Sequence, residues 1–433
     1  MKKYFILGLL CISLTNSWAK SSDDRIKMKK FLEKNFSGIE IKEMNAKEPF
    51  LFIWELKINQ QLNHTISGSG TFKQKIFLYH RGFKNPNVLV TEGYDVANRV
   101  YEPTLILDAN QISVEYRFFG ASAPEKINWN LLNHHQALMD LNYIHKTLSK
   151  IYKKRWVCTG ISKGGTTAAL YKLTYPKSIA AAVVYVAPFA LEQEDKRTID
   201  HYKNKVSTPE CRDNVFQFQR NLLKKREELK PFLVELSKSE QVSFSLGWDK
   251  VIDYAAVEYP FSFWQWGFQC EEIPTNDASA LEMYQHIEEV VDFNFYDDPT
   301  CASFLPAYYQ FMTEYGYYGF DTTGLADLLF FENELSNLEF CPKGVTIKYD
   351  NSYILSMYQR AVNEGNNIIY IYGENDTWTS CGVIPSSKTN AQRFVKKDGG
   401  HRTRIRDLSI SDKDKIYNTL QKWTRYKTKP LPY

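Results

Sequence analysis

One serine in this sequence stands in a pattern that can do chemistry. A short apolar run, Val157 to Ile161, ends in Gly160-Ile161-Ser162-Lys163-Gly164 and is followed by a helical pattern from Thr166 to Tyr175. Gly-x-Ser-x-Gly between a strand and a helix is typical of a nucleophile elbow, a tight turn that holds the serine hydroxyl clear of the sheet. Residues with little or no side chain are needed beside the serine, because the turn leaves no space there. The pattern predicts that Ser162 is a catalytic nucleophile.

A carboxylate emerges from a later apolar run. Residues 368–372 are β-branched and aromatic, and they lead into Gly373-Glu374-Asn375-Asp376-Thr377-Trp378. Ligand and catalytic groups of open α/β sheets gather at the carboxyl ends of the strands. Asp376 is therefore the expected acid, and Glu374, two residues earlier, is the alternative.

A serine nucleophile needs a histidine to take its proton and a carboxylate to orient that histidine. In hydrolases with this elbow the chain order is serine, acid, histidine. His201, His286 and His401 all follow the serine, but the first two precede the acid. Only the third, on the loop Asp398-Gly399-Gly400-His401-Arg402, satisfies the order. The expected triad is therefore Ser162, Asp376 and His401.

The same chemistry needs two donors for the oxyanion that forms during attack. One is expected to be the backbone N–H of Lys163, which follows the nucleophile, and the other an N–H from the loop after the third strand of the hydrolase sheet. The apolar run Val88 to Thr91 continues into Glu92-Gly93-Tyr94. We assign the second donor to Tyr94.

The elements that would position these groups follow an α/β rhythm. An antiparallel pair of strands is expected first, and then a mostly parallel sheet covered by helices on both faces. The expected strands are Phe50 to Leu56, Ile76 to His80, Val88 to Thr91, Ile112 to Tyr116, Val157 to Ile161, Ala182 to Val186, Ile368 to Tyr372 and Gln392 to Lys396.

Long helical patterns, at 214–237 and 278–291, interrupt that rhythm and predict an inserted, mainly helical lid. The chain is thus expected to comprise a signal peptide (1–19), the first part of the catalytic domain (20–188), the lid (189–364) and the second part of the catalytic domain (365–433). An aromatic cluster in the lid can either fill its core or line a substrate cleft. Its members are Phe261, Phe263, Trp264, Trp266, Phe268, Tyr308, Tyr309, Tyr315, Tyr317 and Tyr318.

Composition limits the classes of function. The 433 residues are 43% hydrophobic and 24% charged, which suits a soluble globular protein, and the net charge of +4 is too small to favour nucleic acid as a partner. Lys2-Lys3, an apolar run from Tyr4 to Leu14 and Ser17-Trp18-Ala19 predict a cleaved secretory signal, with no later segment apolar enough to span a membrane. No cofactor or metal is expected, since the usual cysteine and histidine spacings are lacking.

Six cysteines remain after the leader, in a compartment that permits disulfides. Up to three bridges can form among them, and the sequence does not choose the pairing. Cys158, in the apolar run before the serine, can equally be a buried thiol. The six are Cys158, Cys211, Cys270, Cys301, Cys341 and Cys381.

Several of these motifs together resemble the PS-10 family of secreted bacterial serine peptidases, and more distantly the prolyl carboxypeptidase and dipeptidyl peptidase group. The resemblance is carried by Ser162-Lys163-Gly164-Gly165, Tyr185-Val186-Ala187-Pro188, Cys211-Arg212, Glu115-Tyr116-Arg117-Phe118-Phe119-Gly120, Gln136-Ala137-Leu138-Met139-Asp140, Phe268-Gln269-Cys270-Glu271 and Gly373-x-x-Asp376-x-Trp378. It implies an α/β-hydrolase fold with a helical cap and the same triad, cleaving peptides near one end.

An enzyme that removes short peptides from a free amino end needs a negative group for the substrate's amine. Glu271 and Glu272 are the candidates, with Glu192, Glu194 and Asp195 as competitors, and Glu115 with Arg117 is interpreted as a structural ion pair. The expected function is a secreted or periplasmic serine exopeptidase that releases short peptides, tripeptides above all, from the free amino end of oligopeptides through an acyl-enzyme. A prolyl-type carboxypeptidase, a capped esterase and a non-catalytic binding protein on the same fold are the alternatives.

Overall fold

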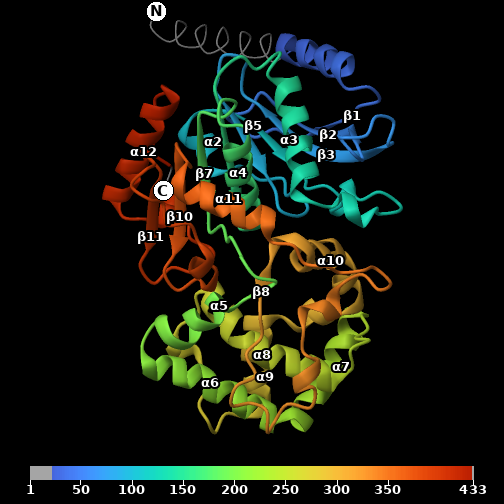
Figure 1. Cartoon of the computed structure of the whole chain (residues 1–433), viewed down its shortest axis with the longest axis vertical. Coiled ribbons are helices and arrows are strands. Elements are labelled where there is room, and N and C mark those ends of the chain that lie inside the picture. The colour runs from blue at the N-terminus through green and yellow to red at the C-terminus, as the bar shows by residue number, and fades with distance from the viewer. Residues whose placement is uncertain (1–21, 432–433) are drawn as a thin grey trace, which may run out of the picture. The chain divides into compact units, whose positions relative to one another are not determined.

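The computed structural model describes residues 22–431, which form two compact units (Figure 1). The first comprises residues 22–160, 170–183 and 414–431, and the second residues 161–169 and 184–413. The predicted signal peptide lies outside the described residues. The predicted insertion of 189–364 divides the chain differently from these units, and it stays a prediction.

The first unit is built on a sheet whose strands follow the order β1-β2-β3-β5-β4-β6-β7. Strands β1, β2, β3 and β5 pair antiparallel in turn, whereas β4 pairs parallel with both β5 and β6. Every residue of β4 and β5 is buried, as expected for strands covered on both faces. The predicted antiparallel pair is confirmed, and β1 is a strand that the sequence did not suggest. The strands are β1 Glu40–Met44, β2 Phe52–Gln61, β3 Thr71–His80, β4 Asn87–Thr91, β5 Asn110–Val114, β6 Trp156–Ile161 and β7 Ala181–Tyr185.

Helices flank this sheet, and one of them contains a member of a buried ion pair. Arg117 is fully buried and bonds both carboxylate oxygens of Asp140 on α3, at 2.7 and 2.9 Å. The predicted pair of Glu115 with Arg117 is therefore wrong. The carboxylate of Glu115 instead accepts hydrogen bonds from the backbone N–H of Val96 and Ser122. The helices are residues 22–35, α2 Glu102–Ile106, α3 His134–Leu148, α4 Lys163–Thr174 and α12 Ile410–Thr424, the last two being shared with the second unit.

The second unit contains most of the helices, together with two short strand pairs. Strand β10 pairs parallel with β11, and β8 pairs parallel with β9. The predicted helical stretch 214–237 is two helices, α6 and α7, because the α-helical conformation breaks at Lys225. The elements are β8 Glu194–Asp195, β9 Tyr317–Tyr318, β10 Ile368–Gly373, β11 Gln392–Lys396, α5 Lys196–Asp200, α6 Pro209–Lys224, α7 Arg226–Glu240, α8 Trp248–Trp266, α9 Ala280–Val291, α10 Asp298–Gln310 and α11 Ser352–Asn363.

Helix α8 is the central helix of this unit, and almost all of it is buried. It contains Pro260, which has no N–H to offer the carbonyl of Ala256 one turn earlier. The side chain of Gln219 on α6 supplies the missing donor at 2.7 Å. A helix with an internal proline is thus kept continuous by a neighbouring helix.

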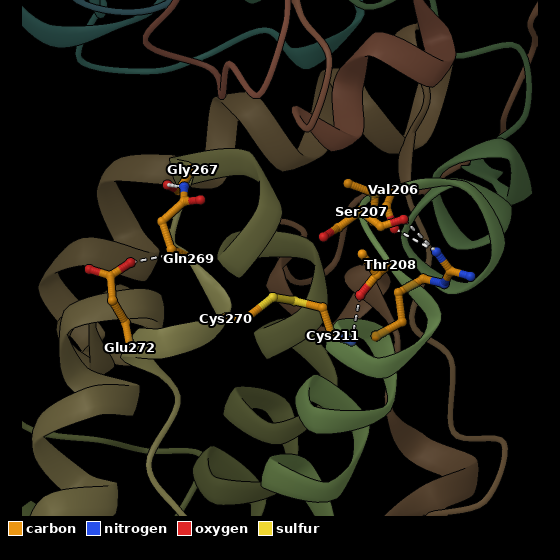
Figure 2. Close-up of a disulfide and its surroundings, with 9 residues drawn as sticks. Val206, Ser207, Thr208, Cys211, Gly267, Gln269, Cys270 and Glu272 are labelled. Atoms are coloured by element: carbon orange, nitrogen blue, oxygen red, sulfur yellow. Dashed lines mark hydrogen bonds between the residues drawn. A yellow bond between two sulfur atoms is a disulfide. The ribbon is translucent and has the colours of Figure 1, made fainter.

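One disulfide ties the start of α6 to the segment after α8 (Figure 2). It joins Cys211 to Cys270 across 59 residues of sequence. The other four cysteines of the described chain, Cys158, Cys301, Cys341 and Cys381, are free thiols. The sequence allowed up to three bridges among these six cysteines, and the structure contains one.

Helices in the described part of the chain are too short or too polar to cross a membrane.

Candidate active site

Ser162 lies at the turn from β6 into α4 with a φ of 56°. This left-handed conformation is uncommon for a residue other than glycine and is typical of the strained serine in a nucleophile elbow. The serine N–H donates to the carbonyl of Tyr185 at 2.9 Å, and the serine carbonyl accepts the N–H of Thr166 at 3.0 Å, which begins the helix. The side chain is partly exposed. The local structure is thus the one that the motif predicts.

Asp376 and His401 are joined by a hydrogen bond. The Oδ2 atom of Asp376 lies 2.8 Å from Nδ1 of the imidazole, and the carboxylate is fully buried. Its other oxygen accepts the N–H of Trp378 at 3.1 Å, so both oxygens are held. Glu374, the alternative acid, is exposed and accepts the N–H of Asp398 instead. A buried carboxylate on Nδ1 orients the ring and stabilises it when it gains a proton on Nε2.

Tyr185, at the end of β7, contacts both the elbow and the histidine loop. Its carbonyl accepts the N–H of Ser162, and its ring lies 5.7 Å from the guanidinium carbon of Arg404. That guanidinium donates to the carbonyl of His401 at 3.0 Å. The serine and the histidine therefore lie near one tyrosine, in the same unit as the acid. The role of these three residues as a catalytic triad stays a prediction.

The two rejected histidines have other surroundings. His286 bonds the hydroxyl of Tyr259 at 2.7 Å, and burial lowers its pKa to about 4. His201 lies in a π-helical turn, His201–Lys205, close to the backbone of Asn375. Burial also lowers its pKa, although Asn375 and the charge of Asp376 oppose that effect.

Lys163, the predicted first oxyanion donor, has a buried side chain. Burial holds the pKa of its ammonium well below the ordinary value, and the charge of Glu314 opposes this. Glu314 belongs to a second π-helical turn, Phe311–Tyr315, whose Tyr315 hydroxyl lies 2.9 Å from the hydroxyl of Thr166. This turn thus contacts the first turn of α4 through the Tyr315 hydroxyl. Such turns are frequent at functional sites, and no sequence motif indicated this one.

Tyr94, the predicted second donor, belongs to the first unit, three residues after the end of β4. Its carbonyl accepts the N–H of Tyr116 at 3.0 Å. Its role in an oxyanion hole stays a prediction.

The predicted amine-binding residues, Glu271 and Glu272, are both exposed. Figure 2 shows that the carboxylate of Glu272 turns back to the N–H of Gln269 and caps its own short turn. Glu272 also lines a cavity of about 490 Å³ together with Trp266 and Arg402.

The competing carboxylates have different environments. Asp195 is buried and paired with Arg197 at 2.6 Å, and Glu194 binds the side chain of Asn337 at 3.2 Å. Glu192 is exposed.

Sequence reasoning missed a further carboxylate, Glu258. It is buried in α8, and that burial raises its pKa to about 7.

Most of the aromatic cluster is buried, as expected if it fills a core. Two of its rings nevertheless contact Trp378, the residue whose N–H binds Asp376. The rings of Phe261 and Tyr318 stack with centroids 3.8 Å apart, and both meet the ring of Trp378 edge-on, at 5.1 and 5.8 Å. The ring of Trp266 is partly exposed, with its centroid 6.1 Å from that of His401.

A family model described as PS-10 peptidase S37 matches residues 25–400. The chain belongs to this family. It is therefore a serine peptidase, and the resemblance found in the sequence motifs is confirmed. The described sheet, with its parallel strands and flanking helices, is that of an α/β-hydrolase.

The chain is also similar to individual proteins. The chain is 29% identical to a prolyl tri/tetrapeptidyl aminopeptidase of Streptomyces mobaraensis over 373 residues, covering 84% of this chain and 78% of the relative. It is 23% identical to the lysosomal Pro-X carboxypeptidase of Bos taurus, with 71% of each chain covered. Among solved structures, a proline iminopeptidase of Mycobacterium smegmatis is 10% identical with a TM-score of 0.41, covering 85% of this chain and 99% of that one.

Proposed function

We propose that this protein is a serine exopeptidase that releases short peptides, tripeptides above all, from the free amino end of oligopeptides. The hydrogen bond between the buried Asp376 and Nδ1 of His401, in the same unit as the strained turn at Ser162, carries the proposal. The relative named prolyl tri/tetrapeptidyl aminopeptidase supports attack at the amino end more directly than the Pro-X carboxypeptidases support attack at the carboxyl end.

Each residue has one task in this mechanism. The Ser162 hydroxyl attacks the scissile carbonyl carbon while Nε2 of His401 takes its proton, and Asp376 stabilises the resulting imidazolium. Backbone N–H groups hold the oxyanion, and the N–H of Lys163, the residue after the nucleophile, is one of them. The C–N bond then breaks, and the imidazolium gives its proton to the leaving amine. Water, activated by the same imidazole, hydrolyses the acyl-enzyme and releases the short peptide with a new carboxylate.

The proposed location of the enzyme rests on its N-terminal sequence. We place the mature chain outside the cytoplasm, in the periplasm or medium, because residues 1–19 have the pattern of a signal peptide. The disulfide between Cys211 and Cys270 supports an oxidising compartment.

The decisive experiment uses Ser162→Ala with a free-amine tripeptide p-nitroanilide as substrate. We expect hydrolysis to be lost, and retained hydrolysis would refute the mechanism. Mass spectrometry of products from a mixed peptide library then reads which end is attacked and how many residues are released. Single residues released from the carboxyl end would favour the carboxypeptidase alternative.

A further inference from the structure

Glu258, on α8, is a buried carboxylate that the proposed mechanism does not use. Its side chain accepts a hydrogen bond from the Ser262 hydroxyl at 2.6 Å through Oε1. The other oxygen, Oε2, is shielded from solvent and lacks a hydrogen-bond partner at normal distance within residues 22–431, although the Tyr318 hydroxyl lies near the carboxylate. No basic side chain of that part of the chain forms an ion pair with it. A buried carboxylate in this state is costly, and a cationic ligand would supply the missing donor and charge.

The face of α8 that contains Glu258 is turned toward the catalytic loops. Glu258, Phe261, Ser262 and Gln265 are spaced three, four and seven residues apart, which puts them on one side of the helix. The carbonyl of Phe261 accepts the Thr377 hydroxyl at 3.1 Å, beside the acid. The carbonyl of Gln265 accepts the N–H of His401 at 2.6 Å. The unsatisfied carboxylate and the predicted triad thus share one side of the helix.

Aromatic rings continue from the acid toward this carboxylate. Trp378, whose N–H binds Asp376, meets the stacked rings of Phe261 and Tyr318. Burial raises the pKa of the Glu258 carboxyl, and the nearby Tyr318 hydroxyl lowers it. Aromatic faces beside a carboxylate are a favourable environment for an ammonium group.

The spacing along α8 fits a short peptide. Seven residues separate Gln265 from Glu258, which corresponds to roughly 10 Å of helix. Three residues of extended peptide span about the same length. Consider a substrate whose scissile bond lies at the histidine end of this face. Its third residue, counted from that bond toward the amino end, would then lie beside Glu258.

We propose that Glu258 binds the protonated α-amine of the substrate and thereby sets the length of the released peptide at three residues. This rests on the proposed aminopeptidase function. It replaces Glu271 and Glu272, which are exposed, as the site of amine recognition.

The test compares Glu258→Gln with the matched controls Glu271→Gln and Glu272→Gln. For each enzyme, kcat/KM is measured on a tripeptide p-nitroanilide with a free amine and on its N-acetylated form. In Glu258→Gln the ratio of the two values should fall at least about 30-fold, because a buried charge pair is lost. Both controls should keep the wild-type ratio. An unchanged ratio in Glu258→Gln, or a collapse in either control instead, would overturn the proposal.

Two further measurements separate the possible failures. Hydrolysis of p-nitrophenyl acetate and the melting temperature show whether a variant is folded with working catalytic groups. Glu258→Asp keeps the charge but shortens its reach, so it should still prefer free amines, with a raised KM. A wild-type enzyme that lacks any preference for free amines overturns the proposed function and this inference together, whereas a preference that survives in Glu258→Gln overturns this inference alone.

Discussion

The main-chain N–H of His401 donates to the main-chain carbonyl of Gln265 at 2.6 Å, so the loop with the predicted base is tied to the end of α8. Gly400 makes this approach possible. A β-carbon at that position would lie 2.8 Å from the Gln265 carbonyl oxygen and 2.9 Å from the nitrogen of Gly267. The helix that contains Glu258 and the position of the imidazole are therefore coupled through a backbone contact that only glycine permits.

Gly400→Ala should displace the imidazole without unfolding the protein. We expect kcat to fall at least about 100-fold, because a displacement of about 1 Å at a catalytic group has that effect. Gly344→Ala is the control, since this glycine has a φ of 73° but open space around its α-carbon. It should lose some thermal stability and keep kcat. Steady-state kinetics and melting curves of both variants decide the matter, and a near-normal kcat in Gly400→Ala would contradict the coupling.

Asp376→Asn should lower kcat by about 10⁴-fold, because an amide on Nδ1 stabilises neither the required tautomer nor the imidazolium. Glu374→Gln is the matched control, two residues away, exposed and bonded to the N–H of Asp398. We expect that variant to stay near wild-type activity. Equal losses in the two variants, measured on the same free-amine substrate, would remove the distinction between the two carboxylates.

The contributions of Lys163 and Glu314 to the free energy of unfolding should depend on each other. Lys163→Met and Glu314→Gln each remove one of two charges that interact, and we expect each variant to lose about 1 kcal/mol in the free energy of unfolding. The double variant should lose clearly less than the two single losses together, because both single variants lose the same interaction. Urea unfolding of the four proteins measures this coupling. Strict additivity would show that Glu314 does not act through Lys163.

The disulfide should stabilise the second unit through the loop that it closes. For a separation of 59 residues, chain entropy predicts that Cys211→Ser with Cys270→Ser lowers the free energy of unfolding by about 4 kcal/mol. Urea unfolding of the oxidised wild type and of the double serine variant measures the loss. A Cys301→Ser variant, which removes a free thiol, is the control and should change the stability little.

Local patterns in the sequence predicted the turn at Ser162 and the loop positions of Asp376 and His401, whereas their catalytic roles stay a prediction. The turn at Ser162 is marked by glycines two positions before and after it, and the positions of Asp376 and His401 follow from strand ends and chain order, so short segments carry that information. Most strands were predicted for the same reason, because their buried faces appear as apolar runs. Strand β1 was not, since all five of its residues are exposed or only partly buried, and its sequence therefore lacks that signal.

Contacts between distant segments could not be predicted in this way. Glu258 lies in an apolar helix, where one acidic residue carries no signal of its role until the neighbouring rings are known. Arg117 pairs with Asp140, 23 positions away, and not with the nearer Glu115. The support of Lys163 by Glu314 joins residues that are 151 positions apart by their numbers. Each depends on tertiary packing, which composition and periodicity do not encode.

The buried carboxyl of Glu258 should also make stability depend on pH in a predictable direction. Burial raises the pKa of this carboxyl from 4.5 to about 7, and the hydroxyls of Ser262 and Tyr318 oppose that rise. Because the folded state favours the protonated form, the stability that this group contributes is present at low pH. It is lost as the pH rises from below 4.5 through about 7.

Glu258→Gln removes that loss, because an amide does not ionise. The variant should therefore gain stability over the wild type between pH 5 and pH 8, by at most about 3 kcal/mol. Melting temperatures of both proteins at the two pH values measure the effect, and Glu271→Gln corrects for the removal of an exposed carboxylate. A stability difference that is the same at both pH values would mean that Glu258 is already compensated in the free protein, and then it would have no need of a substrate amine.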